Sequence, residues 1–188
     1  YVLCADSGLD AALAAGIDID GVIGDFDSAK QTSVALMKAR GIPHIVYPAI
    51  KDDTDGMACV RFILDKKPNE VVFAGAGGGR VDHALANFLL LAYLEKNGVA
   101  ARIEQEELTA WAVHGEKTVR GRAGDLLSVL QMTEELTLSL SGLFYPLDHY
   151  AVEFGHPIGV SNVMTQETAA IQVHKGWALV IHYKAQPE

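Results

Sequence analysis

Apolar and polar positions follow a regular rhythm along the first half of the chain, where short β-branched runs alternate with longer helix-like stretches. The apolar runs are residues 21–24, 45–47 and 70–74, and the helix-like stretches are residues 31–40, 55–66 and 81–96. This alternation predicts a parallel sheet flanked by helices. Each apolar run ends in a polar or glycine-rich turn, and open α/β sheets bind ligands at such turns.

The pattern changes after residue 98, where strand-like runs recur with few helix signals. These runs are residues 101–104, 109–113, 126–130, 136–140, 169–173 and 178–183. Their spacing predicts an antiparallel sandwich. We therefore predict an α/β fold, in which a Rossmann-like parallel domain (1–98) precedes an antiparallel β-sandwich domain (99–188). The chain opens on an apolar run without an initiator methionine, so we expect a longer natural chain and an N-terminal domain that lacks its first strand.

Composition narrows the classes of function. The net charge is −9 and the basic residues are scattered, which argues against a nucleic-acid partner. The most apolar stretch, residues 84–94, is too short to span a bilayer, so we expect no membrane partner. Cys4 and Cys59 are too few for a disulfide framework, which favours buried thiols and a cytoplasmic location.

The first acidic cluster directly follows the apolar run at residues 21–24. Asp25 and Asp27 are two residues apart at the end of a predicted buried strand, where their charges repel unless a cation or hydrogen-bond donors compensate. Hard oxygen ligands of this kind suit Mg²⁺. The alternative is that one aspartate caps the next helix beside Ser28 and the other is solvated.

A second acidic cluster, residues 51–55, follows the next apolar run. If a helix begins here, Asp52 and Asp55 lie three residues apart on one face, and Thr54 or Asp53 can cap its exposed amides. Lys51 can meet a phosphate or pair with its acidic neighbours. Acidic residues also commonly open helices because they complement the helix dipole.

The third cluster lies between the apolar run at residues 70–74 and a strongly apolar helix. Its glycines, Gly77, Gly78 and Gly79 among them, let consecutive N–H groups turn toward one anion, and Arg80 adds a forked cation. The Walker A and dinucleotide spacings are both absent. Asp82 is expected to cap or orient the helix start, and a tight turn is the simpler alternative for the glycines.

These motifs occur in the order ADxG (5–8), GDFDS (24–28), KDxTD (51–55) and a glycine-rich GGRxDH segment ending at residue 83, with Asn87 downstream. GLFYPL (142–147) and GVSN (159–162) follow in the second half. The set resembles the thiamine pyrophosphokinase family over nearly the whole chain. The resemblance implies transfer of a diphosphate from ATP to thiamine, with Mg²⁺, in a homodimer that binds thiamine where the subunits meet.

Carried over by position, the resemblance assigns a role to each motif residue. The catalytic set is Asp25, Asp27, Asp52, Asp55 and Arg80, and its four aspartates are also the metal ligands. The nucleotide-binding set is Asp6, Lys51, Gly77, Gly78, Gly79, Arg80, Asp82 and Asn87. Thiamine is expected to contact Asp55, Tyr145, Ser161 and Asn162, with the Tyr145 ring stacked on the cationic thiazolium.

The chain departs from the family pattern at three positions. Ser7 replaces a glycine, Met57 replaces a glutamate that often follows the TD pair, and Phe144 replaces a basic residue. Other functions stay open, namely a magnesium-dependent pyrophosphokinase for another small alcohol such as a pterin, a phosphohydrolase with an aspartyl nucleophile, and a non-catalytic thiamine-binding module. Formation of AMP together with thiamine diphosphate separates these possibilities.

Overall fold

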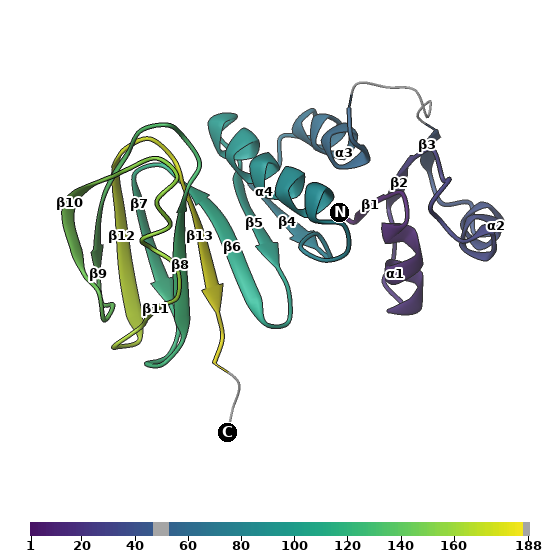
Figure 1. Ribbon diagram of the computed structural model, residues 1–188. Coiled ribbons are helices and arrows are strands. Elements are labelled where there is room, and N and C mark those ends of the chain that lie inside the picture. Colours follow the sequence, from purple (N-terminus) through teal and green to yellow (C-terminus); the bar gives the residue numbers. More distant parts are fainter. Residues whose placement is uncertain (47–52, 186–188) are drawn as a thin grey trace. The chain divides into compact units, whose positions relative to one another are not determined.

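The computed structural model describes residues 1–46 and 53–185 (Figure 1). The chain divides into two compact units, Tyr1–Pro68 and Asn69–Glu188. We describe each unit by itself.

The first unit is built on a small parallel sheet in the order β1-β2-β3. Its elements are β1 (Leu3–Ala5), α1 (Gly8–Ala14), β2 (Gly21–Gly24), α2 (Gln31–Ala39), β3 (His44–Val46) and α3 (Asp55–Leu64). All four residues of β2 are buried because this strand lies between the other two. Its register places Val22 opposite both Cys4 and His44.

Short apolar segments from sheet and helices form the core of this unit. Cys4, Leu9, Val22 and Met37 are buried in one cluster, which joins β1 and β2 to α1 and α2. Helix α3 packs against β1 and β2. It begins where the Thr54 hydroxyl accepts a hydrogen bond from the Met57 N–H at 3.2 Å, which satisfies one exposed amide of the first turn.

The second unit contains two sheets and one long helix. Its elements are β4 (Glu70–Ala74), α4 (Val81–Lys96), β5 (Ala100–Glu104), β6 (Leu108–Val113), β7 (Glu116–Arg120), β8 (Leu126–Gln131), β9 (Leu136–Ser141), β10 (Leu147–Val152), β11 (Asn162–Val163), β12 (Thr168–Lys175) and β13 (Ala178–Tyr183). The larger sheet has the order β11-β8-β13-β6-β5-β4, and only its β4–β5 pair is parallel. The smaller sheet, β10-β9-β12-β7, is antiparallel.

The two sheets share one apolar core. On β12, Ala169, Ile171 and Val173 are buried while their neighbours in the strand are exposed, as expected for a strand with one face in the core. Strand β13 is buried on both faces, and helix α4 packs on the adjoining strands β5 and β6. These layers form a sandwich whose larger sheet extends into an α/β segment (Figure 1).

The predicted fold class is confirmed, with a parallel sheet N-terminally and antiparallel sheets C-terminally. The sequence pattern missed α1, β7, β10 and β11, because these elements are short or bury few apolar side chains. The domain boundary near residue 98 stays a prediction. The compact units divide after Pro68 because β4 is a strand of the larger sheet of the second unit and α4 packs on that sheet. Within the described residues, no helix combines the length and apolar character needed to cross a bilayer.

Candidate functional site

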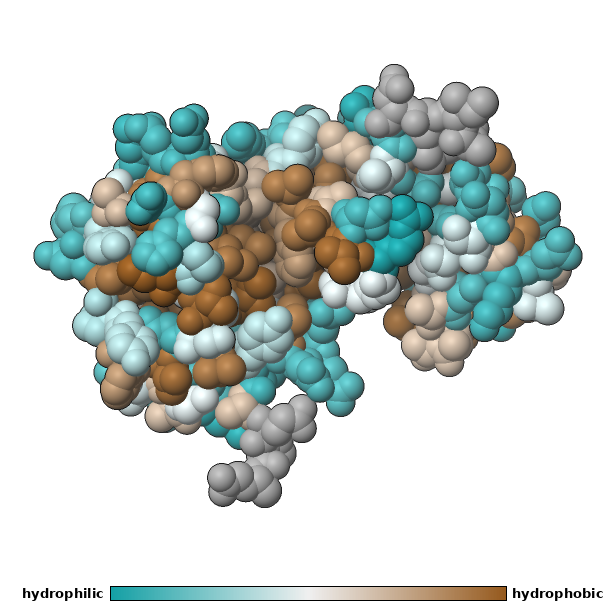
Figure 2. Space-filling view, in the orientation of Figure 1, coloured by the Kyte–Doolittle hydropathy of each residue, from teal (hydrophilic) through white to brown (hydrophobic). Residues whose placement is uncertain are grey.

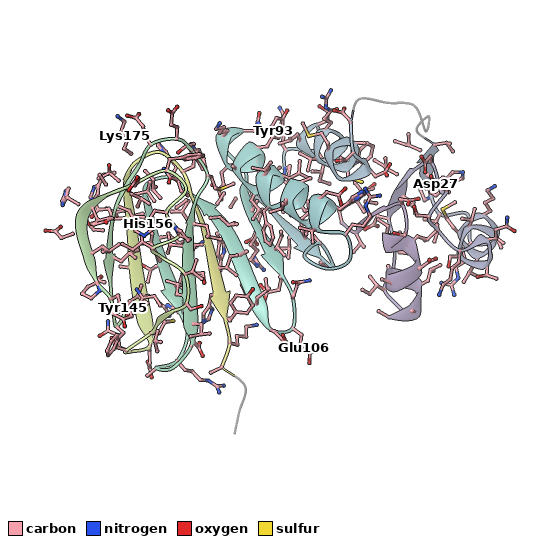
Figure 3. The ribbon with its side chains drawn as sticks, in the orientation of Figure 1. Asp27, Tyr93, Glu106, Tyr145, His156 and Lys175 are labelled. Carbon is pink, nitrogen blue, oxygen red and sulfur yellow. The ribbon has the colours of Figure 1, made fainter. Side chains whose placement is uncertain are left out.

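Three carboxylates gather at the carboxyl ends of neighbouring parallel strands in the first unit. Asp6 directly follows β1, and Asp25 and Asp27 follow β2. One carboxylate oxygen from each residue lies within 4.8 Å of the other two. Figure 3 labels Asp27 beside the strand ends. We call Asp6, Asp25 and Asp27 the acidic cluster.

The backbone around this cluster is tightly constrained. A Cβ at Gly24 would lie 3.0 Å from the Cα and Cβ of Asp6, so only glycine lets these two strand ends approach so closely. Asp6 and Phe26 both adopt positive φ angles, 42° and 64°, which are uncommon for residues with side chains. The Asp6 N–H also donates to the Ile23 carbonyl oxygen at 2.9 Å. The fold thus holds the cluster in a strained but well-defined turn.

Local donors satisfy only part of the cluster. The Asp27 N–H donates to Asp25 Oδ1 at 3.1 Å, and the Ser28 hydroxyl donates to Asp27 Oδ1 at 2.9 Å. Asp6 is 7% exposed, and its buried Oδ1 has no hydrogen-bond partner in the part of the chain that is described. A buried carboxylate oxygen without a donor is costly unless a cation completes the site. The donor set therefore fits a hard divalent cation such as Mg²⁺.

The pKa of Asp6 reflects this environment. Burial raises the pKa of the Asp6 carboxyl above its ordinary value, while hydrogen bonds from the Ser7 N–H and the Ser28 hydroxyl oppose the rise. The negative charges of Asp55 and Asp25 raise it further. A bound cation would reverse the effect of these charges and favour the ionised carboxylate.

The second predicted acidic segment is described only in part. Asp55, at the first turn of α3, contributes to the electrostatic environment of Asp6 and so belongs to the same site. Asp53 instead pairs with Arg61, with two N–O distances of 3.2 Å. Lys51 and Asp52 lie outside the described residues, so their predicted roles stay predictions.

The glycine-rich segment belongs to the second unit, where it connects β4 to α4. Gly75 and Gly79 have φ angles of 70° and 79°. Gly77 lies against the Gln105 side chain, since a Cβ there would lie 2.6 Å from Gln105 Oε1, the movable end of that side chain. The Asn87 amide donates to the Ala76 carbonyl oxygen at 2.9 Å and ties the loop to α4. Asn87 therefore supports the loop, whereas direct contact of the loop with a nucleotide stays a prediction.

Arg80 and Asp82 form a two-point ion pair at the start of α4. Arg80 Nε lies 3.1 Å from Asp82 Oδ1, and Arg80 Nη2 lies 2.6 Å from Asp82 Oδ2. Asp82 Oδ1 also accepts the His83 N–H at 3.0 Å, as the expected orienting role requires. The hydrogen bond from Arg80 lowers the pKa of Asp82 to about 2. The pair thus holds the exposed guanidinium in place at the predicted phosphate loop.

Three of the four predicted thiamine residues, Tyr145, Ser161 and Asn162, lie in the second unit, in loops and at the start of β11, whereas Asp55 belongs to the first unit. Asn162 is 4% exposed, and its Oδ1 accepts the N–H groups of Tyr145 and Val163, both at 3.0 Å. Its Nδ2 donates to the Tyr145 carbonyl oxygen at 2.8 Å. Asn162 therefore fixes the backbone that presents the exposed Tyr145 ring, which Figure 3 labels, and Phe144 contacts that ring edge to face at 4.9 Å.

Ser161 directly precedes Asn162 and lies in an exposed turn with a φ angle of 57°. Its N–H donates to the Ser128 hydroxyl oxygen at 3.0 Å, which joins the turn to β8. A thiamine contact by Ser161 stays a prediction.

The sequence placed Asp25, Asp27 and Asp55 in one site but assigned Asp6 only to the nucleotide. The structure adds Asp6 to the acidic cluster and shows Ser28 as a donor to it. A usable signal was present, because Asp6 follows an apolar run just as Asp25 does, and the ends of adjacent parallel strands lie side by side.

The fold and the acidic cluster define a class of two-part transferases, in which a parallel α/β unit with carboxylates at its strand ends precedes an antiparallel sandwich. The model of "Thiamin pyrophosphokinase, catalytic domain" matches residues 1–103. That of "Thiamin pyrophosphokinase, vitamin B1 binding domain" matches residues 114–177. The chain belongs to the thiamin pyrophosphokinase family, which confirms the resemblance.

Individual relatives agree with this assignment. The thiamine pyrophosphokinase of Bacillus subtilis (strain 168) is 30% identical over 180 residues, which cover 94% of this chain and 84% of that protein. A crystal structure of the Bacillus subtilis enzyme has a TM-score of 0.86 at 27% identity, covering 98% of this chain and 87% of that one. A family protein from Enterococcus faecalis has a TM-score of 0.85 at 27% identity, covering 99% and 89%.

Proposed function

We propose that this chain transfers a diphosphate group from ATP to the hydroxyl group of thiamine, giving thiamine diphosphate and AMP. The observation that carries the proposal is the acidic cluster, in which three carboxylates lie within 4.8 Å of one another and the buried Oδ1 of Asp6 has no hydrogen-bond partner among the described residues. The two matched family models support thiamine as the acceptor over a pterin. They equally give no support to a phosphohydrolase or to a purely binding module.

Asp6, Asp25 and Asp27 would hold Mg²⁺, with Asp55 beside them and Asp52 as a further predicted ligand. The ion, when bound, offsets the negative charge of the phosphate oxygens. The cluster residues have a separate task, which is to fix where that positive charge lies. The strained turn at Asp6 and Phe26 supports this role, because it determines the positions of the carboxylates before substrate binds.

The nucleotide phosphates would lie on the glycine-rich loop. Its backbone N–H groups and the Arg80 guanidinium are the donors, while Asp82 and Asn87 keep the loop in shape. Lys51 would add a second cation.

Thiamine would bind against the sandwich of a second copy of the chain in a homodimer. The exposed Tyr145 face suits the cationic thiazolium, Asn162 holds Tyr145, and Ser161 lies next to it. Other exposed apolar residues of the same loops are Phe144, Phe154, Ile158 and Val160. Figure 2 shows hydrophobic side chains gathered on the visible face of this unit, which supports its use as a contact surface.

In the reaction, the thiamine hydroxyl oxygen forms a bond to the β-phosphorus of ATP, and the bond from that phosphorus to the α,β-bridging oxygen breaks. AMP leaves with the electrons of the broken bond, and the hydroxyl proton passes to a nearby carboxylate, for which we propose Asp55. The protein contributes mainly alignment and charge stabilisation. A cytoplasmic location would supply both ATP and thiamine.

The direct test is incubation with ATP, Mg²⁺ and thiamine while AMP and thiamine diphosphate are measured together by chromatography. We expect equimolar formation of the two products and none with a hydroxymethylpterin as acceptor. Release of phosphate without AMP, or turnover of the pterin in place of thiamine, would contradict the proposal.

A further inference from the structure

A cavity of about 710 Å³ opens at the end of the sandwich unit where β5 ends, next to the glycine-rich loop, because Gln105 of the β5–β6 turn lies against Gly77. Its walls come from the β5–β6 turn, the β7–β8 turn and the residues at the end of β13. Glu106, which Figure 3 labels, marks the first of these walls. We call this space the turn cavity. Its volume is that of a small-molecule site and far exceeds the space of an ordered water.

Backbone hydrogen bonds hold the walls of the turn cavity together. Asp125 lies at its base, where Oδ1 accepts the Ala185 N–H and Oδ2 accepts the Arg122 N–H, both at 2.9 Å. The Lys184 N–H donates to the Glu107 carbonyl oxygen at 3.0 Å and joins the third wall to the first. The shape of the cavity is therefore set by the fold before any ligand arrives.

A buried hydrogen-bonded pair closes the base. His182 Nε2 lies 2.7 Å from Asp125 Oδ2, and the two side chains are 5% and 3% exposed. A Cβ at Gly121 would lie 2.5 Å from Asp125 Oδ2, so the backbone passes directly over the pair. Among the described residues, the Asp125 oxygens accept hydrogen bonds from His182 and two backbone amides and make no ion pair with Arg120 or Arg122.

Side chains of both charges line the turn cavity. Arg120 and Arg122, on either side of Gly121, are exposed and make no ion pair within the described residues. Lys184 is already paired with Glu104 at 3.4 Å. The wall formed by the β5–β6 turn carries the carboxylates of Glu106 and Glu107. In a chain of net charge −9, two unpaired guanidiniums in one cavity are not the result of a generally basic surface.

We propose that the turn cavity binds a small zwitterion, with a phosphate group on the Arg120–Arg122 wall and an organic cation on the glutamate wall. Guanidinium groups suit phosphate oxygens because their N–H donors are forked and always charged. Thiamine diphosphate joins both charges in one molecule and fits this chemistry, so the cavity is a second site for the product. The choice of that ligand rests on the proposed function, whereas the charges and shape of the site do not.

The test follows the imidazole signals of the seven histidines by ¹H–¹³C NMR in metal-free protein, with the His182 signal assigned by triple-resonance experiments. Without Mg²⁺ and ATP the catalytic reaction cannot proceed, so the result is independent of turnover. We expect saturable movement of the His182 signal with thiamine diphosphate, and weaker binding of inorganic diphosphate and of thiamine alone.

Matched variants locate the binding. We expect Arg120→Gln with Arg122→Gln to raise the dissociation constant for thiamine diphosphate at least about tenfold. Arg40→Gln, an exposed arginine in the first unit, should leave it unchanged. Glu106→Gln should weaken binding of thiamine diphosphate but not of inorganic diphosphate. Thermal melts verify that each variant is folded.

Two results would overturn the proposal. One is a His182 signal that stays still at millimolar ligand while signals elsewhere move. The other is equal affinity in the wild type and the double arginine variant. Equal binding of inorganic diphosphate and thiamine diphosphate would reject the zwitterion and leave a simple anion site. Failure of the catalytic assay with a positive His182 titration would count against the proposed function alone.

Discussion

Each unit buries an aspartate, and the two carboxylates differ in how completely hydrogen bonds satisfy them. In the second unit, Asp125 is 2% exposed and its two oxygens accept from His182 and two backbone amides. In the first unit, Asp6 is 7% exposed and one oxygen has no partner among the described residues. A buried aspartate therefore stabilises the second unit, whereas the one in the first unit has an oxygen without a hydrogen-bond partner among the described residues.

The pKa directions follow this difference. Burial alone would raise the pKa of Asp125, but the amides of Ala185 and Arg122 and the contact with His182 lower it overall. Burial raises the pKa of Asp6, and the nearby carboxylates add to the rise. Buried polar groups that serve structure are satisfied within the fold, whereas those that serve function wait for a ligand.

The largest effect is expected when the acidic cluster loses a ligand. Asp27→Ala should reduce formation of thiamine diphosphate by at least about a thousandfold, because metal charge stabilisation is worth several kcal/mol. Asp27 is exposed, so the melting temperature should change little. Asp18→Asn, an exposed aspartate outside the cluster, is the matched control. Unimpaired turnover by the Asp27 variant would remove it from the metal site.

The next largest effect is expected on the free energy of unfolding, when the second unit loses its buried aspartate. Asp125→Ala should lower the free energy of unfolding by about 3 kcal/mol, because it leaves His182 and two amides buried without an acceptor. Urea unfolding measures the loss, and Asp125→Asn should lose less. Since the folded-state pKa of Asp125 is lowered, its contribution is present above a pH of about 4 and is lost as the pH falls further. A loss near zero would mean that the pair is not structural.

A smaller effect is expected at the surface of the sandwich, where the exposed Tyr145 ring is proposed to bind thiamine. Tyr145→Ala should raise the KM for thiamine about tenfold with little change in kcat, because its proposed role is to bind the thiazolium. Tyr150→Ala is the control, because Tyr150 is another exposed tyrosine of this unit, at 38% against 66% for Tyr145, and lies on β10 outside the loops proposed to contact thiamine. Equal KM values for the wild type and the Tyr145 variant would place thiamine elsewhere.

The smallest effect separates the two buried aspartates most sharply. Asp6→Asn should stabilise the metal-free protein by about 1 kcal/mol at neutral pH, because it removes the charge of a buried carboxylate whose Oδ1 has no hydrogen-bond partner among the described residues. The pKa of Asp6 is raised in the fold, so its ionisation costs stability as the pH rises, and the gain should vanish below a pH of about 4.

Mg²⁺ provides the matching control for Asp6. It should raise the melting temperature of the wild type but not of the Asp6→Asn variant, as measured by differential scanning fluorimetry. A variant that is less stable than the wild type at neutral pH would show that the Asp6 charge is satisfied in the fold.

Much of the fold could be predicted because buried faces of helices and strands require apolar residues at regular positions in the sequence. Residues 81–96 and 178–183 were predicted with the bounds of α4 and β13, since both carry long apolar runs. Strand β10 was missed because its burial is slight, and β11 because it has only two residues. The periodicity of apolar residues in the sequence reflects how much of a helix or strand is buried, so elements with few buried side chains are hard to predict.

The candidate site shows the same division. The pair Asp25 and Asp27 could be chosen from their place after an apolar run, but the unpartnered oxygen of Asp6 could not. Asn162 was expected to line a pocket, and the structure uses its amide to hold Tyr145. Which donors reach a given oxygen depends on segments far apart in the chain, and spacing along the sequence does not encode those distances.

The sequence by itself determined the fold class, the family and the order of the acidic and glycine-rich turns, because these follow from local periodicity and residue type. Only the tertiary structure decided which buried aspartate is satisfied and which is not. The physical reason is that solvation of a carboxylate depends on the donors packed around it, and folding brings those donors from distant strands, as it brings Ala185 and His182 to Asp125.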